Sequence, residues 1–335
     1  TIGVLLHPTA LPSSRVCGGF GQPARKWLEL LSENGVGVWQ VLPLSPTDPT
    51  GSPYSSPSSF ALNPWFLDPN DLAEEGYLLS KDLERLAGNS NDDFSSVDFP
   101  LADLRSKQLG EFLRVAWEQQ SPKRHSAFQN WRNKQHWLED HSLYMALREQ
   151  NNNRPWWEWP DPLAHHQWAA LRTWKKLHKN LLLEHHLLQW HLSRQWKEVR
   201  SLAKEKGIVI FGDLPFYVAR DSADVWSRRS LFSIQSDGAM MLQSGVPPDY
   251  FSDTGQLWGT PIYKWLNHFL TGFHWWRSRL SRQWELFDLL RLDHFRALVS
   301  CWAVPGNEAT AQNGFWSPSP GGILLWLFKR DCKGR

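Results

Sequence analysis

The sequence predicts an α/β protein whose parallel strands form a sheet or a barrel. Two observations indicate this class. Four short runs rich in β-branched and large apolar residues are typical of strands buried on both faces, and amphipathic helical patterns lie between them. Strands that alternate with helices favour a parallel arrangement. The four runs are Thr1–His7, Gly35–Leu44, Gly207–Phe216 and Leu289–Phe295, with the strands themselves expected at Ile2–Leu6, Val36–Leu42, Ile208–Asp213 and Leu289–Asp293.

The composition is that of a chain with a large buried core. Of its 335 residues, 41% are hydrophobic and 21% are charged, which excludes extensive disorder. The net charge is +2, so we expect neither a nucleic-acid partner nor a membrane partner. The three cysteines, Cys17, Cys301 and Cys332, are scattered along the chain, as is usual for a protein of a reducing cytosol.

The first helix is expected between the first two strand runs. Ala24, Trp27, Leu28 and Leu31 recur at the spacing of one helical face. Gly35 follows at a position that suits the end of a helix, because glycine adopts the left-handed conformation without strain.

The segment between the second and third strand runs is too long for a single crossover helix. It begins with loop composition at Ser45–Pro64 and becomes helical and rich in tryptophan from about Glu111 to Lys206. We interpret it as an inserted helical subdomain. The large apolar residues that repeat every three or four positions are Leu171, Trp174, Leu177, Leu181, Leu188, Leu192, Trp196 and Val199, with a step at His185.

The predicted organisation therefore has three parts. Residues 1–49 hold the first two strands, residues 50–206 hold a loop and the helical insert, and residues 207–335 hold the third and fourth strands. The insert contains two histidine pairs, His165-His166 and His185-His186. Adjacent residues do not share a helix face, and no metal-ligand spacing is present, so packing or surface roles are expected and no metal.

Charged residues interrupt the apolar strand runs at their ends. Side chains alternate along a strand, so Arg291 and Asp293 share one face while Leu290 and Leu292 take the other. The arginine would pair with the carboxylate, either as a structural ion pair or as part of an active site at the strand ends of a barrel. Asp213 ends the third run in the same way. Two carboxylates at one barrel mouth suggest chemistry on a glycosidic bond.

The composition of the segment Ser244–Pro261 predicts a stiff aromatic loop with no regular secondary structure. Pro247 and Pro248 fix the backbone, and Gly255 and Gly259 permit turns closed to other residues. The chain contains 22 tryptophans, most of which we assign to core packing. In loops, by contrast, a flat ring suits a ligand that is apolar on one face and polar on the other. The rings offered by this loop are Tyr250, Phe251 and Trp258.

Motifs along the whole chain resemble those of the 4-α-glucanotransferases, also called amylomaltases or disproportionating enzymes, of the α-amylase superfamily. Five stretches occur in the order of that family, and "TAQNGFW" followed by "PGG" (Thr310–Gly322) continues it; the helical insert is the part without a motif match. The five are "GVLLHPTALPS" (Gly3–Ser13), "WQVLPLSPT" with "SPYSSPSSFALNP" (Trp39–Pro64), "GDLPFYVARDSADVW" (Gly212–Trp226), "GVPPDYFSDTGQLWGTPIYKW" (Gly245–Trp265) and "RLDHFRAL" (Arg291–Leu298).

The resemblance implies a (β/α)8 TIM barrel with inserted subdomains and a retaining double displacement. It implies that Asp293 is the nucleophile, that Arg291 orients and ionises it, and that Asp213 is a partner of the arginine. It places His294 and Tyr54 against the sugar beside the cleaved bond. For Tyr54, the alternative is a turn residue that packs between prolines.

The same resemblance implies that residues 244–261 form a lid over the acceptor side of the cleft. Such a lid favours sugar over water as the acceptor. Tyr250, Phe251 and Trp258 would contact the incoming chain, and Asp249 would either bind sugar hydroxyls or cap a turn. The implied substrates are α-1,4-glucans and maltooligosaccharides, with no cofactor, in a bacterial cytoplasm or a plastid stroma. The rival functions are a hydrolase of the same superfamily and a non-catalytic glucan-binding protein.

One departure from the family pattern concerns the general acid/base. In the family, a glutamate in an "AEDLG"-like motif on a fifth barrel strand has this role, and the sequence ends at Arg335 without that motif. Glu308 belongs to a loop motif and is not a replacement. We therefore expect about four barrel strands, a chain that is a fragment, and little or no activity, because general acid catalysis contributes about 10² to 10⁴-fold.

Overall fold

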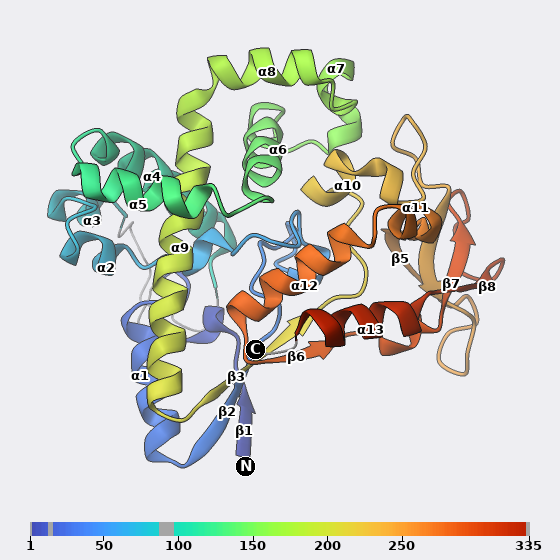
Figure 1. Cartoon of the computed structure of the whole chain (residues 1–335), viewed down its shortest axis with the longest axis horizontal. Coiled ribbons are helices and arrows are strands. Elements are labelled where there is room, and N and C mark those ends of the chain that lie inside the picture. The colour runs from blue at the N-terminus through green and yellow to red at the C-terminus, as the bar shows by residue number, and fades with distance from the viewer. Residues whose placement is uncertain (1, 13–15, 87–96, 333–335) are drawn as a thin grey trace.

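The computed structural model describes residues 2–12, 16–86 and 97–332 (Figure 1). Thr1, Ser13 and residues 333–335, which belong to predictions made above, lie outside the described residues. A parallel sheet with the strand order β1-β2-β3-β6 lies at the centre of the fold, which confirms the predicted α/β class. Each predicted run supplies one strand: β1 (Ile2–Leu5), β2 (Val36–Gln40), β3 (Val209–Leu214) and β6 (Leu289–Leu292).

Helices between the strands cover one face of this sheet. They are α1 (Gln22–Glu33), α9 (Lys179–Glu205) and α12 (His274–Leu286). Trp39 of β2 is fully buried beneath them, with its ring centroid 6.2 Å from that of Trp196 of α9. Burial of such aromatic side chains on one face fixes the helices to the sheet.

Helix α1 forms as its apolar spacing predicts. Ala24, Leu28 and Leu31 are buried, while Trp27 is half-buried. The helix ends at Glu33, and Gly35 follows with φ of 67°. That angle lies in the left-handed region, so the prediction that Gly35 ends the helix is confirmed.

The segment between β2 and β3 folds into helices, and these begin before the predicted position near Glu111. Helix α9 is 27 residues long and runs from this helical insert down to the sheet (Figure 1). The preceding helices are α2 (Pro69–Glu74), α3 (Ser80–Leu86), α4 (Phe99–Trp117), α5 (Pro122–Arg132), α6 (Leu138–Gln150), α7 (Asp161–Ala164) and α8 (Trp168–Leu177).

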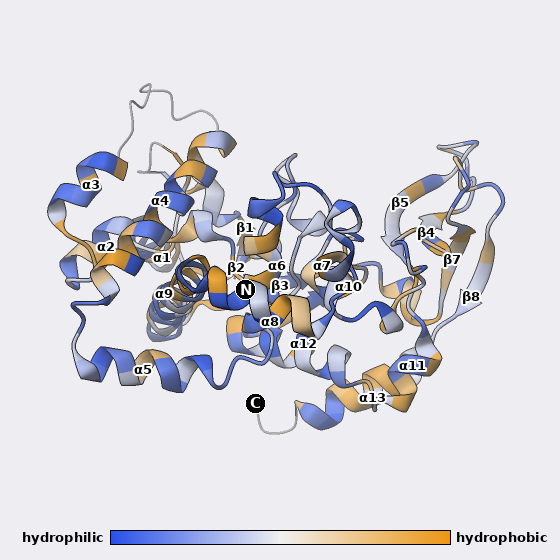
Figure 2. Ribbon diagram, turned by 90° about the horizontal axis from the view of Figure 1, so that it is seen from above, coloured by the Kyte–Doolittle hydropathy of each residue, from blue (hydrophilic) through white to orange (hydrophobic). Residues whose placement is uncertain are grey.

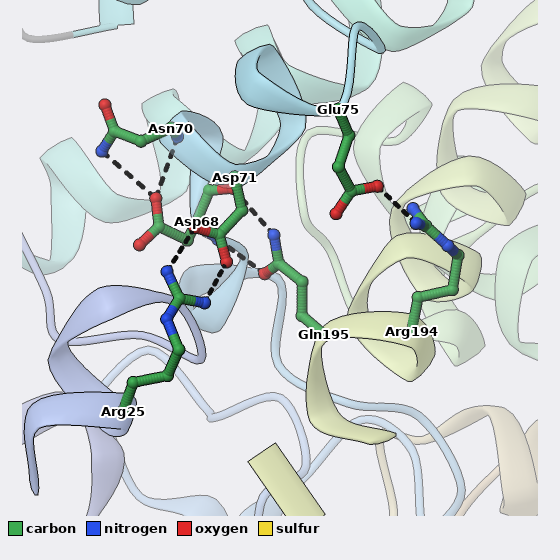
Figure 3. Close-up of polar contacts among 7 residues, drawn as sticks. All are labelled: Arg25, Asp68, Asn70, Asp71, Glu75, Arg194 and Gln195. Carbon is green, nitrogen blue, oxygen red and sulfur yellow. Dashed lines mark hydrogen bonds and ion pairs between the residues drawn. The ribbon is translucent and has the colours of Figure 1, made fainter. Parts of the chain in front are cut away.

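Polar side chains connect the insert to the sheet layer. Arg25 of α1 donates two hydrogen bonds, of 2.7 and 2.8 Å, to the carboxylate of Asp71 in α2 (Figure 3). The side-chain amide of Gln195 in α9 bonds to both the N–H and the C=O of Asp68, each at 2.9 Å. Arg194 of α9 pairs with Glu75. The Gln195 contacts satisfy two backbone groups of Asp68 that would otherwise destabilise the fold if left buried and unpaired.

A second sheet lies beside the first, with the antiparallel order β5-β4-β7-β8 (Figure 1). It corrects the prediction that residues 244–261 lack regular structure, because the two ends of this segment pair as strands. The prolines at 247 and 248 come directly after β4, where no further backbone N–H is needed for pairing. The four strands are β4 (Leu242–Val246), β5 (Gln256–Pro261), β7 (Ser300–Pro305) and β8 (Phe315–Pro318).

The remaining helices are α10 (Ala223–Ser227), α11 (Trp265–Leu270) and α13 (Gly321–Asp331). Helix α13 carries many hydrophobic residues (Figure 2), and the side chain of Trp326 is 59% exposed. Across the described ranges, we find no helix with both the length and the hydrophobicity that a membrane span requires.

The paired histidines of the insert do not form a metal-ligand group with other described residues. His186 is buried, with its Nε2 3.5 Å from a carboxylate oxygen of Glu139. Burial lowers the pKa of His185 and of His186 to about 4. His186 therefore has the packing role that we expected.

Candidate active site

The site is built where β3 and β6 end, at the same edge of the parallel sheet. Asp213 of β3 lies in register with Arg291 of β6. Asp293 follows β6 directly, and its backbone N–H donates to the C=O of Leu214 at 3.0 Å, which extends the pairing by one step. The sheet therefore brings together two carboxylates that are distant in the sequence.

The guanidinium of Arg291 joins the two carboxylates. Its Nη1 lies 2.6 Å from Oδ2 of Asp213, and its Nη2 lies 2.5 Å from Oδ1 of Asp293. Burial lowers the pKa of Arg291, but the two carboxylates outweigh this influence and raise it above its ordinary value. The planar guanidinium carries two fixed donors, so it holds both carboxylates in set orientations.

Asp213 is the buried member of this group, with only 2% of its surface exposed. Its Oδ2 also accepts a hydrogen bond of 2.8 Å from the hydroxyl of Tyr54. Its Oδ1 is buried without a partner among the described residues. Burial raises the pKa of Asp213, and the bond from Tyr54 and the charge of Arg291 oppose that rise without cancelling it. Asp213 thus lies where a partner of the arginine was expected.

Tyr54 lies in a 3₁₀ turn, Pro53–Ser55, in the loop that follows β2. Its side chain is anchored at the hydroxyl by Asp213, while 37% of the residue stays exposed. Burial of the phenol and the adjacent carboxylate raise its pKa, so the hydroxyl remains a donor. Of the two hypotheses for Tyr54, packing between prolines alone does not account for the hydrogen bond from its hydroxyl to Asp213.

Three rings meet beside the nucleophile candidate. His294 directly follows Asp293 and adopts the left-handed conformation, with φ of 49°. Trp258 of β5 meets it edge to face, with the ring centroids 4.7 Å apart. Tyr217 lies 5.9 Å from Trp258 and 6.0 Å from His294. Sequence reasoning did not single out Tyr217, although it lies inside the quoted stretch Gly212–Trp226.

The tip of the segment 244–261 extends into solvent. Tyr250 and Phe251 are 96% and 91% exposed, and their rings contact each other at 5.6 Å. Asp249 Oδ1 accepts hydrogen bonds from the backbone N–H groups of Phe251 and Ser252, at 2.9 and 3.0 Å. Of the two roles left open for Asp249, the structure shows the turn cap.

Positive φ angles shape the second arm of this segment, as predicted. Gly255 has φ of 66° and Gly259 has φ of 64°. A Cβ at Gly255 would lie 2.3 Å from the carbonyl oxygen of Val246, so only glycine fits there.

Two further residues complete the surroundings. Arg279 of α12 is buried and donates to the carbonyl oxygens of Pro215 and Phe216, at 2.7 and 3.1 Å, which holds the segment after β3 in place. The sequence pattern did not reveal this role. Glu308 lies between β7 and β8, where its carboxylate accepts a hydrogen bond of 3.2 Å from Asn313. It is a loop residue, as expected.

Comparisons with known proteins agree with this geometry. A sequence family described as 4-alpha-glucanotransferase matches residues 6–333. The 4-alpha-glucanotransferase of Aquifex aeolicus is 41% identical over 335 residues, covering 96% of this chain and 65% of that protein. The protein of the same name from Synechocystis sp. is 39% identical over 325 residues, covering 95% of this chain and 63% of its own length. The chain therefore spans slightly less than two thirds of these relatives.

A solved structure has the same arrangement of elements. The structure titled as the amylomaltase from Streptococcus agalactiae in complex with acarbose superposes with a TM-score of 0.92 and 32% identity, over 98% of this chain and 66% of that one. The fold of this chain is thus of the TIM-barrel type found in that protein. The described residues contribute four parallel strands to it. On the family match, the sequence identity and the shared structure, this chain belongs to the 4-alpha-glucanotransferase family.

Proposed function

We propose that the chain carries the nucleophile half of a site that transfers segments of α-1,4-glucan between maltooligosaccharides by a retaining double displacement. The observation that carries this proposal is the bridge that Arg291 makes between Asp213 and Asp293 at the sheet edge. Family membership and the acarbose complex of the Streptococcus agalactiae amylomaltase support a glucan as the substrate.

In the first step, a carboxylate oxygen of Asp293 attacks the anomeric carbon. The bond between that carbon and the leaving glucan oxygen breaks, that oxygen takes the electron pair and a proton from a general acid, and a covalent glucosyl-enzyme forms. The hydrogen bond from Arg291 to Oδ1 fixes the carboxylate, so that its other oxygen is oriented for attack. In the second step, a hydroxyl of the acceptor glucan attacks the same carbon, gives its proton to the general base and releases the Asp293 carboxylate.

Asp213 acts in this proposal through the arginine. Its buried carboxylate holds Nη1 of Arg291, and the hydroxyl of Tyr54 donates to the same carboxylate oxygen. The exposed part of the Tyr54 ring is the platform for the sugar that occupies the cleavage site. His294 and Trp258 border the same position.

Transfer rather than hydrolysis requires a held acceptor and restricted water. The hairpin of β4 and β5 supplies Trp258 next to His294 and exposes Tyr250 and Phe251 at its tip. We assign these rings to the acceptor chain. The proposed donor and acceptor substrates are therefore α-1,4-glucans and maltooligosaccharides. We propose the cytoplasm as the location of the protein, or the plastid stroma for a plant protein.

We assign the general acid/base to no residue among those that the structure describes. Glu308 lies in the loop between β7 and β8, where its carboxylate accepts a hydrogen bond from Asn313, and we do not assign the role to it. Our expectation that these 335 residues alone have little activity on ordinary glucans remains a prediction.

The test of the function is an assay with α-maltosyl fluoride as the donor, because fluoride leaves without a proton from a general acid, and with maltotriose as the acceptor. A transferase releases fluoride while the number of reducing ends stays constant, whereas a hydrolase adds one reducing end for each fluoride released. Loss of fluoride release in Asp293→Asn would support the assigned nucleophile. Glucan binding that persists in Asp293→Ala, without fluoride release by the unsubstituted protein, would favour a non-catalytic binding protein.

A further inference from the structure

A cavity of about 150 Å³ lies between α6, α10 and α12, and Phe60 lines both this cavity and the hollow beside Tyr54 and Asp213. We call it the α12 cavity. Its lining comes from residues 134–141 at and before the start of α6, from α10 and the adjacent Arg228, from one side of α12, and from Ser58 and Phe60. A cavity of this size accommodates a six-membered ring such as benzene.

Aromatic side chains form much of its wall. Phe60 and Trp137 stack with their ring centroids 6.5 Å apart and their planes 17° apart. Trp275 meets Phe60 edge to face at 6.3 Å. Ligand sites are commonly built in this way, with aromatic walls and a few polar groups that fix orientation.

The charged groups of the lining balance each other. Two pairs are already formed, with Arg282 2.8 Å from Glu285 and Arg228 3.4 Å from Asp140. A charged ligand of either sign would therefore meet as many side chains that repel it as side chains that attract it. The lining therefore favours a neutral ligand that both donates and accepts hydrogen bonds. The six charged residues are Lys134, Arg228, Arg282, Asp140, Asp224 and Glu285.

Deeply buried polar groups also converge on the α12 cavity. Asp224 has both oxygens satisfied, by the N–H of Ser59 at 2.8 Å and by Nε1 of Trp275 at 3.0 Å. By contrast, Nη2 of Arg282 and Nδ1 of His141 are buried without a hydrogen-bond partner among the described residues. Both side chains belong to the lining, and both residues are at most 5% exposed. Under-satisfied groups of this kind are typical of sites that hold water or a ligand.

We propose that the α12 cavity is an accessory site for one neutral, hydroxyl-rich sugar ring, the glucosyl unit of an α-glucan. The aromatic walls would contact the apolar face of the ring, and Asp140, Glu285 and the serines of α12 would bond to its hydroxyl groups. Only the choice of glucose as the sugar rests on the proposed function, because the cavity shares no charged residue with the Arg291 cluster.

The test uses methyl α-D-glucoside as the probe and ligand-observed NMR titration of the purified chain. Ser278 of α12 lines the cavity and is not deeply buried, so Ser278→Trp fills the space from its rim. Ser201→Trp, on an exposed position of α9, is the matched control. Thermal melting followed by circular dichroism checks that both variants fold. We expect binding at the cavity to weaken at least tenfold in Ser278→Trp and to stay unchanged in Ser201→Trp.

A cross with Tyr54→Ala separates this site from the proposed active site. If both sites bind the probe, Ser278→Trp and Tyr54→Ala each remove one binding event, and the double variant removes both. Probe binding that is the same in Ser278→Trp as in the unsubstituted chain would overturn the accessory site. Binding lost in Ser278→Trp but unaffected by Tyr54→Ala would support the cavity while counting against the proposed glucan site. Displacement of the probe from the cavity by inorganic phosphate would overturn the assignment to a neutral sugar.

Discussion

The hydroxyl of Tyr54 donates a 2.8 Å hydrogen bond to Oδ2 of Asp213, a residue 159 positions later in the chain. The same oxygen accepts from Arg291, so the loop after β2, strand β3 and strand β6 are linked through one carboxylate atom. Because Asp213 is buried, its orientation depends on these two donors. Tyr54 thereby influences Asp293 through Asp213 and Arg291.

The variant Tyr54→Phe tests this link, since it keeps the ring and removes the hydroxyl. Burial already raises the pKa of Asp213, and the lost bond no longer opposes that rise, so the pKa climbs further. At a given pH, more of Asp213 is protonated, and the acidic limb of the kcat/KM profile, measured by fluoride release from α-maltosyl fluoride, moves to higher pH. A hydrogen bond to a charged group contributes about 1.5–3 kcal/mol. We therefore expect kcat/KM to fall by about tenfold or more in Tyr54→Phe.

The control for this change is Tyr250→Phe, because the Tyr250 side chain is almost fully exposed at the hairpin tip. It should leave the pH profile in place. An acidic limb at the same pH in Tyr54→Phe and in the unsubstituted protein would show that the bond does not govern Asp213.

Replacement of Arg291 by lysine should abolish the bridge while it keeps the positive charge. Lysine presents a single ammonium group and does not reproduce the two fixed donors that hold Asp213 and Asp293. We expect kcat to fall by about 10²-fold, with a smaller change in KM, because the loss affects orientation rather than substrate contact.

Arg296→Lys provides the comparison, since Arg296 lies over the ring of Trp316 at 3.8 Å and outside the bridge. Initial rates of fluoride release from α-maltosyl fluoride, a donor that needs no general acid, give the measurement for both variants. Equal rates in Arg291→Lys and Arg296→Lys would mean that the charge of residue 291 is sufficient.

The hairpin tip offers a prediction that separates binding from stability. Alanine at Tyr250 and Phe251 together removes two rings that are over 90% exposed and bury little area on folding. The melting temperature should therefore change little, while KM for the acceptor sugar rises several-fold. Acceptor titrations at a fixed concentration of α-maltosyl fluoride as the donor measure the change in KM. A large drop in melting temperature would show that the tip packs against the rest of the chain.

Buried histidines make the stability depend on pH. Burial lowers the pKa of His141 to about 3, while in the unfolded chain it is near 6.5. The unfolded state therefore binds the proton first as the pH falls below about 6.5, and the stability that this neutral histidine provides is lost progressively toward pH 3. The slope reaches about 1.4 kcal/mol per pH unit for this one group.

Urea unfolding of His141→Gln at several pH values between 7 and 4 tests this. The slope of stability against pH should be shallower than in the unsubstituted chain, and His165→Gln, at an exposed position, should leave it unchanged. A slope that is identical in His141→Gln would exclude a contribution from this histidine.

Local patterns were enough to predict the elements that position the site. Each apolar run became one parallel strand, and the spacing of Ala24, Leu28 and Leu31 gave helix α1, because burial of one face decides both. The alternation that set Arg291 and Asp293 on one face also holds in the structure, where one residue binds the other. These features depend on residues that are near one another in the chain.

Features that depend on distant residues were missed or wrongly predicted. Strand β4 pairs with β7, about 60 residues later, and β5 joins the same sheet by pairing with β4; the composition of residues 244–261 gives no sign of either pairing. The bond between Tyr54 and Asp213 and the carbonyl contacts of Arg279 are likewise tertiary. A single sequence does not contain the register that brings such residues together.

The central claim is that Asp293 becomes covalently attached to the donor sugar. The most direct measurement is the mass of the protein and of its peptides after incubation with 5-fluoro-α-D-glucosyl fluoride, whose fluoride leaves without a proton from a general acid. We predict one glycosyl adduct, located on Asp293 and absent from Asp293→Asn. An adduct that persists in Asp293→Asn, or one that maps to another residue, would contradict the account.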